Sequence, residues 1–145
     1  MFAGAQAAGI PMLSGFDFYV PSGGYQVRAH YWASSEQAND RGEKHVLSVK
    51  LLAGHEVSGV ATIVILPGFT EFCEKYSQVM NCLHYLGYNV LIIDWPGQGL
   101  SGHLGHHPLA VHCDEFADYL DALDAVIETI GLGGQALILL GHSMG

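Results

Sequence analysis

Basic residues are scarce in this sequence of 145 residues. Lys and Arg number 5 in total against 14 Asp and Glu, which gives a formal net charge of -9. Proteins that bind nucleic acid need Lys and Arg gathered on one face, and segments that attach to anionic membranes by charge need a basic cluster. The composition therefore argues against a nucleic-acid partner and against an electrostatic membrane anchor.

Cysteine pairs and long apolar runs are lacking as well. The 3 cysteines, Cys73, Cys82 and Cys113, are odd in number and have no CxxC or zinc-finger spacing, which favours buried, reduced thiols. No apolar run approaches the roughly 18 residues of a membrane-spanning helix. No basic segment precedes the apolar stretch near the N-terminus, as it would in a signal peptide. We therefore expect a cytoplasmic protein without a transmembrane segment, and we leave open a transient contact with a membrane surface.

The residues that are abundant are those of a compact α/β protein, since 50% of the chain is apolar and 19 residues are Gly. The length suits one domain, which we place at residues 16–145 after an N-terminal tail of residues 1–15. Within it, "FDFYV" and "YQVRAHYW" carry the β-branched and aromatic residues of strands and are joined by "PSGG". They predict an antiparallel hairpin from about Phe16 to Trp32. A short strand is also expected within residues 45–53.

Three later runs, at residues 60–66, 89–93 and 135–140, are continuously apolar. Such runs are typical of strands that are covered on both faces in a parallel sheet. Each interval between them predicts a helix, the first ended by Gly87 and the second running from an N-cap at Asp114 to Gly131. The apolar stripes of the two helices are Tyr76, Val79, Met80, Leu83 and Leu86, and Phe116, Leu120, Leu123, Ile127 and Ile130. The predicted fold is an open α/β sheet, antiparallel at its start and parallel thereafter, with right-handed crossovers.

Two clusters of polar residues resemble metal sites at first sight. One is acidic and lies mostly off the apolar stripe of the second helix, so a solvated outer face is the better interpretation. The other consists of histidines in irregular chain, without a helical pair or a carboxylate partner, and we interpret them as solvated loop residues. The members are Asp118, Asp121, Asp124 and Glu128, and His103, His106, His107 and His112. We expect no metal and no cofactor.

The last predicted strand runs directly into "GHSMG", which matches the Gly-x-Ser-x-Gly pattern of a nucleophile elbow with Ser143 at its centre. The motif alone is weak in a chain rich in Gly. Its context is stronger, because a sharp turn from strand to helix needs small residues beside the serine. The alternative is a tight turn with an incidental serine, and we favour the nucleophile.

A second glycine motif, at residues 97–102, has the spacing GxGxxG after the predicted strand at residues 89–93. A dinucleotide site requires that such a motif opens a helix at the end of the strand. Here "DWP" intervenes and "HLGHHP" follows, so nucleotide binding is the weaker hypothesis. A tight loop shaped by the glycines is the stronger one.

Three ordered motifs, "ILPGFTEFCEKY", "NVLIIDWPGQGLSG" and "LLGHSMG", together resemble the α/β-hydrolase fold. The nearest branch is that of the lysophospholipase and monoacylglycerol-lipase-like serine hydrolases. In this branch a strand ends in His-Gly or Pro-Gly, followed by Glu and then by a basic residue and Tyr. A later strand ends in Asp before a Gly-x-Gly-x-Ser loop, and the elbow is often Gly-His-Ser-Met-Gly. The matching residues before the elbow are Pro67, Gly68, Glu71, Lys75, Tyr76, Asp94, Gly97, Gly99 and Ser101.

The resemblance implies a role for each matching residue. Ser143 would attack an ester carbonyl and become transiently acylated. The oxyanion would be held by the backbone N–H groups of Met144 and Phe69. Asp94 is a tempting triad acid, but in the family it belongs to the loop, and we treat it as structural. The residues expected to shape the elbow and the loops are Gly68, Gly141, His142, Gly145, Asp94, Gly97 and Gly99.

The family order of the triad is Ser, then Asp or Glu, then His, so both partners of Ser143 are expected after residue 145. None of the 9 histidines occupies the matching place. We therefore expect the N-terminal half of a hydrolase, cut at its nucleophile elbow. The isolated chain is expected to be inactive because a serine without a base is a feeble nucleophile. It is also expected to be poorly soluble, because residues 135–140 would form an unpaired apolar edge.

The function implied by the resemblance is hydrolysis of carboxylic esters, with lysophospholipid or monoacylglycerol as the substrate. Within enzymes, another ester or a peptide is the alternative substrate. A hydrolase-fold protein that only binds its ligand is an alternative of another class.

Overall fold

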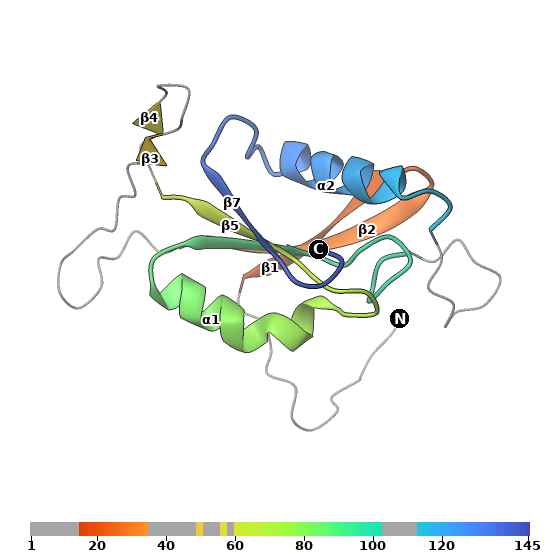
Figure 1. Cartoon of the computed structure of the whole chain (residues 1–145), viewed down its shortest axis with the longest axis horizontal. Coiled ribbons are helices and arrows are strands. Elements are labelled where there is room, and N and C mark those ends of the chain that lie inside the picture. The colour runs from red at the N-terminus through yellow and green to blue at the C-terminus, as the bar shows by residue number, and fades with distance from the viewer. Residues whose placement is uncertain (1–14, 35–48, 51–55, 58–59, 103–112) are drawn as a thin grey trace.

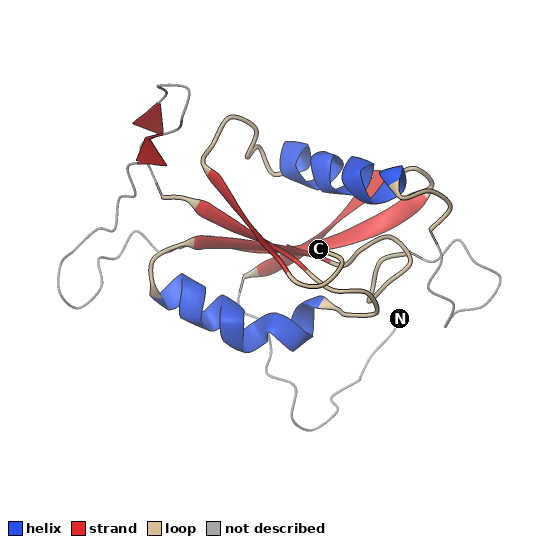
Figure 2. Cartoon of the chain, viewed as in Figure 1, coloured by secondary structure: helices blue, strands red, loops and turns tan. Residues whose placement is uncertain are grey.

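The computed structural model describes residues 15–34, 49–50, 56–57, 60–102 and 113–145. A five-stranded sheet in the order β1-β2-β6-β5-β7 lies between two helices, one on each face (Figure 1). Figure 2 shows the same arrangement by type of element. In chain order the elements are β1 Phe16–Ser22, β2 Tyr25–Trp32, β3 Val49–Lys50, β4 Glu56–Val57, β5 Thr62–Leu66, the 3-10 helix Cys73–Tyr76, α1 Ser77–Tyr85, β6 Asn89–Ile93, α2 Ala117–Thr129 and β7 Leu137–Gly141.

The predicted hairpin is confirmed, because β1 and β2 pair in antiparallel register from Phe16 opposite Tyr31 to Ser22 opposite Tyr25. Gly23 and Gly24 form the two-residue loop, with φ of 53° and 82°. Positive φ at both central residues is the signature of the hairpin turn that matches the twist of the strands. The sheet then continues through β6, which pairs with β2 in antiparallel register.

The predicted parallel strands are confirmed as well. β5 lies between β6 and β7 and pairs with both in parallel register. Successive side chains of a strand point to opposite faces, so β5 and β6 feed two apolar clusters, one under each helix. Ile63, Ile65, Val90 and Ile92 pack on the side of α1, and Val64, Leu66, Leu91 and Ile93 pack on the side of α2. β7 lies at the edge of the sheet, and its residues Ile138, Leu139 and Leu140 are exposed.

Both predicted helix ends at Gly are confirmed. Gly87 has a φ of 91° and donates its N–H to His84 O at 2.9 Å, and Gly131 has a φ of 73° and donates to Glu128 O at 3.0 Å. The predicted N-cap at Asp114 is wrong. α2 begins at Ala117, and no side chain caps it.

The predicted apolar stripe of α2 is only partly right. Phe116 and Leu120 are 68% and 57% exposed, whereas the residues that pack on the sheet are Tyr119, Ala122, Leu123 and Val126. These four have the spacing i, i+3, i+4 and i+7 of a single helix face, and Ala122 lets the helix lie close to the strands. On α1, Met80 is buried as expected, but Val79 is exposed, as is Leu86 directly after the helix.

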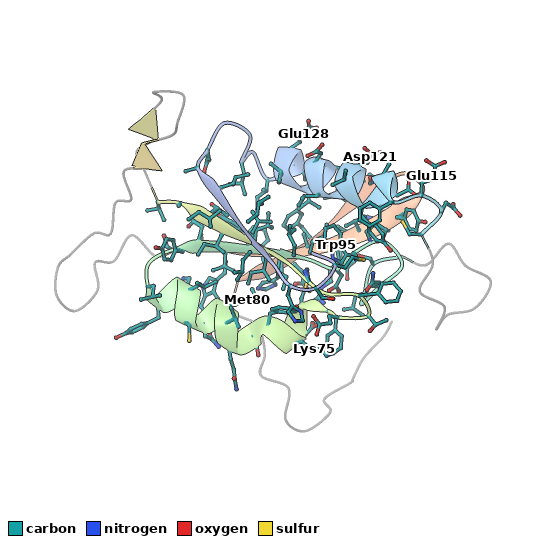
Figure 3. The ribbon with its side chains drawn as sticks, in the orientation of Figure 1. Lys75, Met80, Trp95, Glu115, Asp121 and Glu128 are labelled. Carbon is teal, nitrogen blue, oxygen red and sulfur yellow. The ribbon has the colours of Figure 1, made fainter. Side chains whose placement is uncertain are left out.

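The outer face of α2 is acidic, as predicted for three of the four residues. Asp121, Asp124 and Glu128 are exposed, and Asp121 and Glu128 point away from the sheet (Figure 3). Asp118 is half-buried and accepts a hydrogen bond from Glu115 N at 3.1 Å. In the described ranges no helix is both long and apolar enough to cross a bilayer. The predicted strand within residues 45–53 is described only at Val49–Lys50, which pairs with Glu56–Val57 in a separate two-stranded sheet.

Candidate active site

The elbow (residues 141–145) follows β7 without a break. His142 donates its N–H to Leu66 O at 3.1 Å, and Gly145 donates to His142 O at 3.1 Å. A Cβ added to Gly141 would lie 2.5 Å from Gly145 O, and one added to Gly145 would collide with Leu66 O. Both contacts are with backbone, which has no room to move, so the turn requires Gly at each of these positions.

Ser143 lies at the tip of the elbow with a φ of 59°. A side chain in this left-handed region costs energy that the surrounding structure must offset. Ser143 is exposed and stands at the carboxyl end of a parallel strand. This is the arrangement that a nucleophile elbow needs, and the catalytic role of Ser143 stays a prediction.

The β5 loop (residues 67–72) lies against the elbow, since a Cβ on Gly68 would be only 3.2 Å from Ser143 Cβ. Gly68 O accepts a hydrogen bond from Glu71 N at 3.2 Å. Because a peptide unit is planar and trans, this bond turns the N–H of Phe69 in the opposite direction. Within the part of the chain that the structure describes, neither Phe69 N nor Met144 N donates a hydrogen bond. The two predicted oxyanion donors are therefore unused by the fold.

A carboxylate joins the β5 loop to the elbow. Glu71 Oε2 accepts from Gly68 N at 3.0 Å, lies 3.0 Å from His142 Nδ1 and also accepts from the Tyr76 hydroxyl. The hydrogen bond from Tyr76, followed by those from His142 and Gly68, lowers the pKa of Glu71 to about 2. Partial burial and the adjacent Glu71 raise the pKa of Tyr76 to about 12. At neutral pH the carboxylate is therefore ionised and the phenol is protonated.

The β6 loop (residues 94–102) is organised around Asp94. Its Oδ1 accepts from Cys73 N at 2.8 Å, and its Oδ2 accepts from Leu100 N at 2.9 Å and from Arg28 Nη1 at 3.1 Å. Gly99, with a φ of 54°, packs so closely on the carboxylate that an added Cβ would collide with it. Asp94 is fully buried, and both its oxygens are engaged in holding the loop.

Arg28 is a buried cation that sequence reasoning missed. Its guanidinium binds Asp17 Oδ2 at 2.9 Å, Glu74 Oε1 at 2.7 Å and Asp94 Oδ2 at 3.1 Å, and its side chain is almost fully buried. Burial alone would lower the pKa of Arg28, but the hydrogen bond to Glu74 and the charge of Asp94 outweigh it and raise this pKa. The one signal in the sequence was a basic residue in the middle of the predicted strand "YQVRAHYW".

Two side chains of the β6 loop reach the β5 loop. Trp95 Nε1 donates to Pro67 O at 2.8 Å, and Gln98 Oε1 accepts from Thr70 N at 2.5 Å. Trp95 lies between the sheet and α2 (Figure 3), packed edge-on against Tyr119. These contacts hold the backbone on either side of Phe69.

No metal centre is found among the described residues, where no three His, Cys, Asp or Glu side chains are grouped to hold an ion. The clustered histidines at positions 103, 106, 107 and 112 lie outside those residues. Of the loop glycines, Gly97 has a φ of 74°, which together with Gly99 shapes the tight turn after β6.

Comparison with known proteins gives concordant matches. The family model described as "Serine aminopeptidase, S33" matches residues 58–145. Lysophospholipase L2 of Escherichia coli strain K12 is 35% identical over 119 residues, which cover 79% of this chain and 34% of that protein. Phospholipase YtpA of Bacillus subtilis strain 168 is 35% identical over 86 residues, which cover 59% of this chain and 31% of that protein. The chain thus spans about a third of the length of these curated relatives.

Among solved structures, a soluble variant of monoglyceride lipase from Saccharomyces cerevisiae superposes with a TM-score of 0.63 at 16% identity. The match covers 97% of this chain and 38% of the lipase. At this level of identity the likeness shows a shared fold. Since the family model covers more than half of the chain and the sheet order agrees with the fold, the chain belongs to the serine aminopeptidase S33 family of α/β-hydrolases, among relatives that include lysophospholipases.

Proposed function

We propose that this chain supplies the nucleophile and the oxyanion hole of a serine hydrolase that cleaves carboxylic esters. The observation that supports this most is the exposed Ser143 at a positive φ, beside a loop that offers an unused N–H. In the reaction, the Ser143 Oγ forms a bond to the ester carbonyl carbon while its proton passes to a base. The carbonyl electrons move onto the oxygen, which the N–H groups of Phe69 and Met144 stabilise. The carbonyl re-forms as the bond to the alcohol breaks, and the alcohol leaves with the proton held by the base. Water then hydrolyses the acyl-serine, which releases the acid and restores the Ser143 hydroxyl.

The proposed substrate is a lysophospholipid or a monoacylglycerol. Two curated relatives are named as a lysophospholipase and a phospholipase, and a solved neighbour as a monoglyceride lipase. Esters of this kind have one long acyl chain and a polar alcohol. A transient contact with a lipid surface, where such esters are found, is part of the proposal.

The base and the acid of the triad are proposed to come from outside these 145 residues. Within the described part of the chain, the hydroxyl of Ser143 has no hydrogen-bond partner. Asp94 is engaged by Arg28 and two backbone N–H groups. We therefore expect the isolated chain to show no turnover.

The test compares the 145-residue chain with the longest product of the same reading frame. The longer product should hydrolyse a p-nitrophenyl ester and a monoacylglycerol, react with a fluorophosphonate, and lose both properties in Ser143→Ala. The 145-residue chain should not turn over. Serine-dependent turnover by the short chain would contradict the expected inactivity. A longer product that never reacts with the fluorophosphonate would instead support a protein that only binds its ligand.

A peptide is the alternative substrate, because the matching family is described as a serine aminopeptidase. An aminoacyl p-nitroanilide tests it directly. A kcat/KM on this amide above that on the monoacylglycerol would overturn the ester assignment while leaving Ser143 as the nucleophile.

A further inference from the structure

The Glu71 network (Glu71, Tyr76 and His142) lies where the β5 loop meets the elbow, and the reaction described above does not use it. Gly68 is at its centre. A Cβ on Gly68 would lie 2.9 Å from Glu71 Oε2, 3.1 Å from His142 Nδ1 and 3.2 Å from Ser143 Cβ. Gly68 precedes the proposed oxyanion donor Phe69, and Ser143 precedes the other donor, Met144. The Glu71 carboxylate contacts Gly68 directly and is connected to Ser143 through His142, the residue next to it.

The donors and acceptors of the network fix the position of one proton. An ionised carboxylate only accepts, and the single Tyr76 O–H is donated to Glu71 Oε2. His142 Nδ1 lies 3.0 Å from that same oxygen and 3.1 Å from the Tyr76 oxygen. Both of these neighbours can accept from His142, so Nδ1 must carry the hydrogen. Which ring nitrogen of a histidine is protonated is set by such a partner.

The Gly68 peptide units are held from two directions. Gly68 N donates to Glu71 Oε2 at 3.0 Å and to the Tyr76 oxygen at 3.3 Å, and Gly68 O accepts from Glu71 N at 3.2 Å. The hydrogen bond to Gly68 O sets the direction of the Phe69 N–H, because the Gly68 carbonyl and the Phe69 N–H belong to the same planar peptide unit. The bond to His142 then ties this loop to the residue next to Ser143.

We infer that Glu71, Tyr76 and His142 are positioning residues, which hold the β5 loop and the elbow at a fixed separation and so set the distance between the two oxyanion donors. This inference rests on the proposed function. Oxyanion donors act through their pre-set geometry, and a displacement of about 1 Å near a reacting group can cost up to a hundredfold in rate. Loss of the network is therefore expected to lower kcat about tenfold with little change in KM.

The first arm of the test needs no activity. Long-range proton–nitrogen NMR of the longest product of the reading frame, labelled with ¹⁵N, should show His142 with its hydrogen on Nδ1. The signal is assigned by its absence in His142→Asn. Tyr76→Phe and Glu71→Gln should shift the population toward hydrogen on Nε2. Tyr85→Phe is the matched control, because Tyr85 lies at the exposed end of α1, the helix that directly follows Tyr76. A ring with hydrogen on Nε2 and none on Nδ1 in the unsubstituted protein would overturn the inference.

The second arm measures ester hydrolysis. His142→Ala removes the hydrogen bond between residue 142 and Glu71, whereas His142→Asn keeps an N–H donor near the position of Nδ1. We expect kcat to fall about tenfold in Tyr76→Phe and His142→Ala, and to recover in His142→Asn, with thermal unfolding close to that of Tyr85→Phe. Equal losses in His142→Asn and His142→Ala, or losses confined to KM, would contradict a positioning role. If the unsubstituted protein shows no serine-dependent hydrolysis, the proposed function fails, and the first arm still decides whether the network exists.

Discussion

The turns after β6 and β7 follow similar strands, but the polar residue of the first turn is buried and that of the second is exposed. Both strands are apolar, both run parallel to β5, and both lead into a tight turn that contains a polar residue and two glycines. After β6, Asp94 is fully buried and every oxygen of its carboxylate is hydrogen-bonded. After β7, Ser143 is exposed, has a positive φ and has no hydrogen-bond partner among the described residues.

The difference separates a turn that helps to hold the fold from a turn that we propose for chemistry. A buried carboxylate with both oxygens hydrogen-bonded stabilises its loop and leaves no acceptor free for a ligand. A strained turn with an unpartnered hydroxyl costs stability, and such sites concentrate where function needs them. Three of the following substitutions test this contrast, and a fourth tests the exposed strand that leads into the second turn. Their expected effects on stability decrease in order.

Asp94→Asn should have the largest effect. The change leaves Arg28 buried with one carboxylate fewer and places an N–H₂ group among donors, so we expect a loss of about 3 kcal/mol in the free energy of unfolding. Urea denaturation measures it. Asp121→Asn, on the exposed face of α2, is the control and should change stability by less than about 0.5 kcal/mol. Similar values for the two variants would show that Asp94 does not organise its loop.

Gly99→Ala should cost about 2 kcal/mol. It combines an unfavourable φ with a collision against the Asp94 carboxylate. The matched variant is Gly87→Ala, because Gly87 also has a positive φ but has open space around it. Gly87→Ala should cost only about 1 kcal/mol, the part due to backbone strain. Urea denaturation measures both losses in the free energy of unfolding. If the two are equal, the contact between a Cβ at position 99 and the Asp94 carboxylate costs no stability.

Ser143→Gly should stabilise the chain by about 1 kcal/mol relative to Ser143→Ala. Glycine relieves the strain at φ 59°, whereas alanine keeps it. Both variants lack the nucleophile, so the comparison isolates the backbone. A Ser143→Gly protein no more stable than Ser143→Ala would mean that the elbow is unstrained in solution.

Leu139→Lys should have the smallest effect on stability, within about 0.5 kcal/mol, but should reduce self-association. Leu139 is 58% exposed on the edge strand β7, where a lysine discourages pairing with another strand. Leu120→Lys is the control, since Leu120 is 57% exposed on a helix. Light scattering should fall for Leu139→Lys alone. An equal fall for both variants would indicate that the chains associate through exposed apolar side chains in general and not by pairing of β7.

The sequence predicted the elements that depend on local pattern. The three apolar runs became β5, β6 and β7, and Gly23–Gly24, Gly87 and Gly131 ended their elements as expected. Such features are encoded within a few neighbouring residues. The buried face of α2 was only partly right, because the large side chains of Phe116 and Leu120 suggested a stripe that packing on a twisted sheet did not use.

The candidate site was predictable only where a motif is contiguous in the sequence. The elbow and the glycines beside Asp94 were found in this way. The partners of Arg28 lie 11, 46 and 66 positions away along the chain, and His142 meets Glu71 across 71 positions. No local pattern connects residues at such separations, so these networks emerge only from the fold.

The charge network of Arg28 has a consequence for synthesis on the ribosome. The hairpin emerges first, but the guanidinium gains its last carboxylate only when a residue 66 positions later has been made. Until then the cation keeps its water, since burial without partners is expensive. Docking of the hairpin onto β6 is therefore expected only after Asp94 has been made, while the part of the core under α2 has to wait for residues made later still.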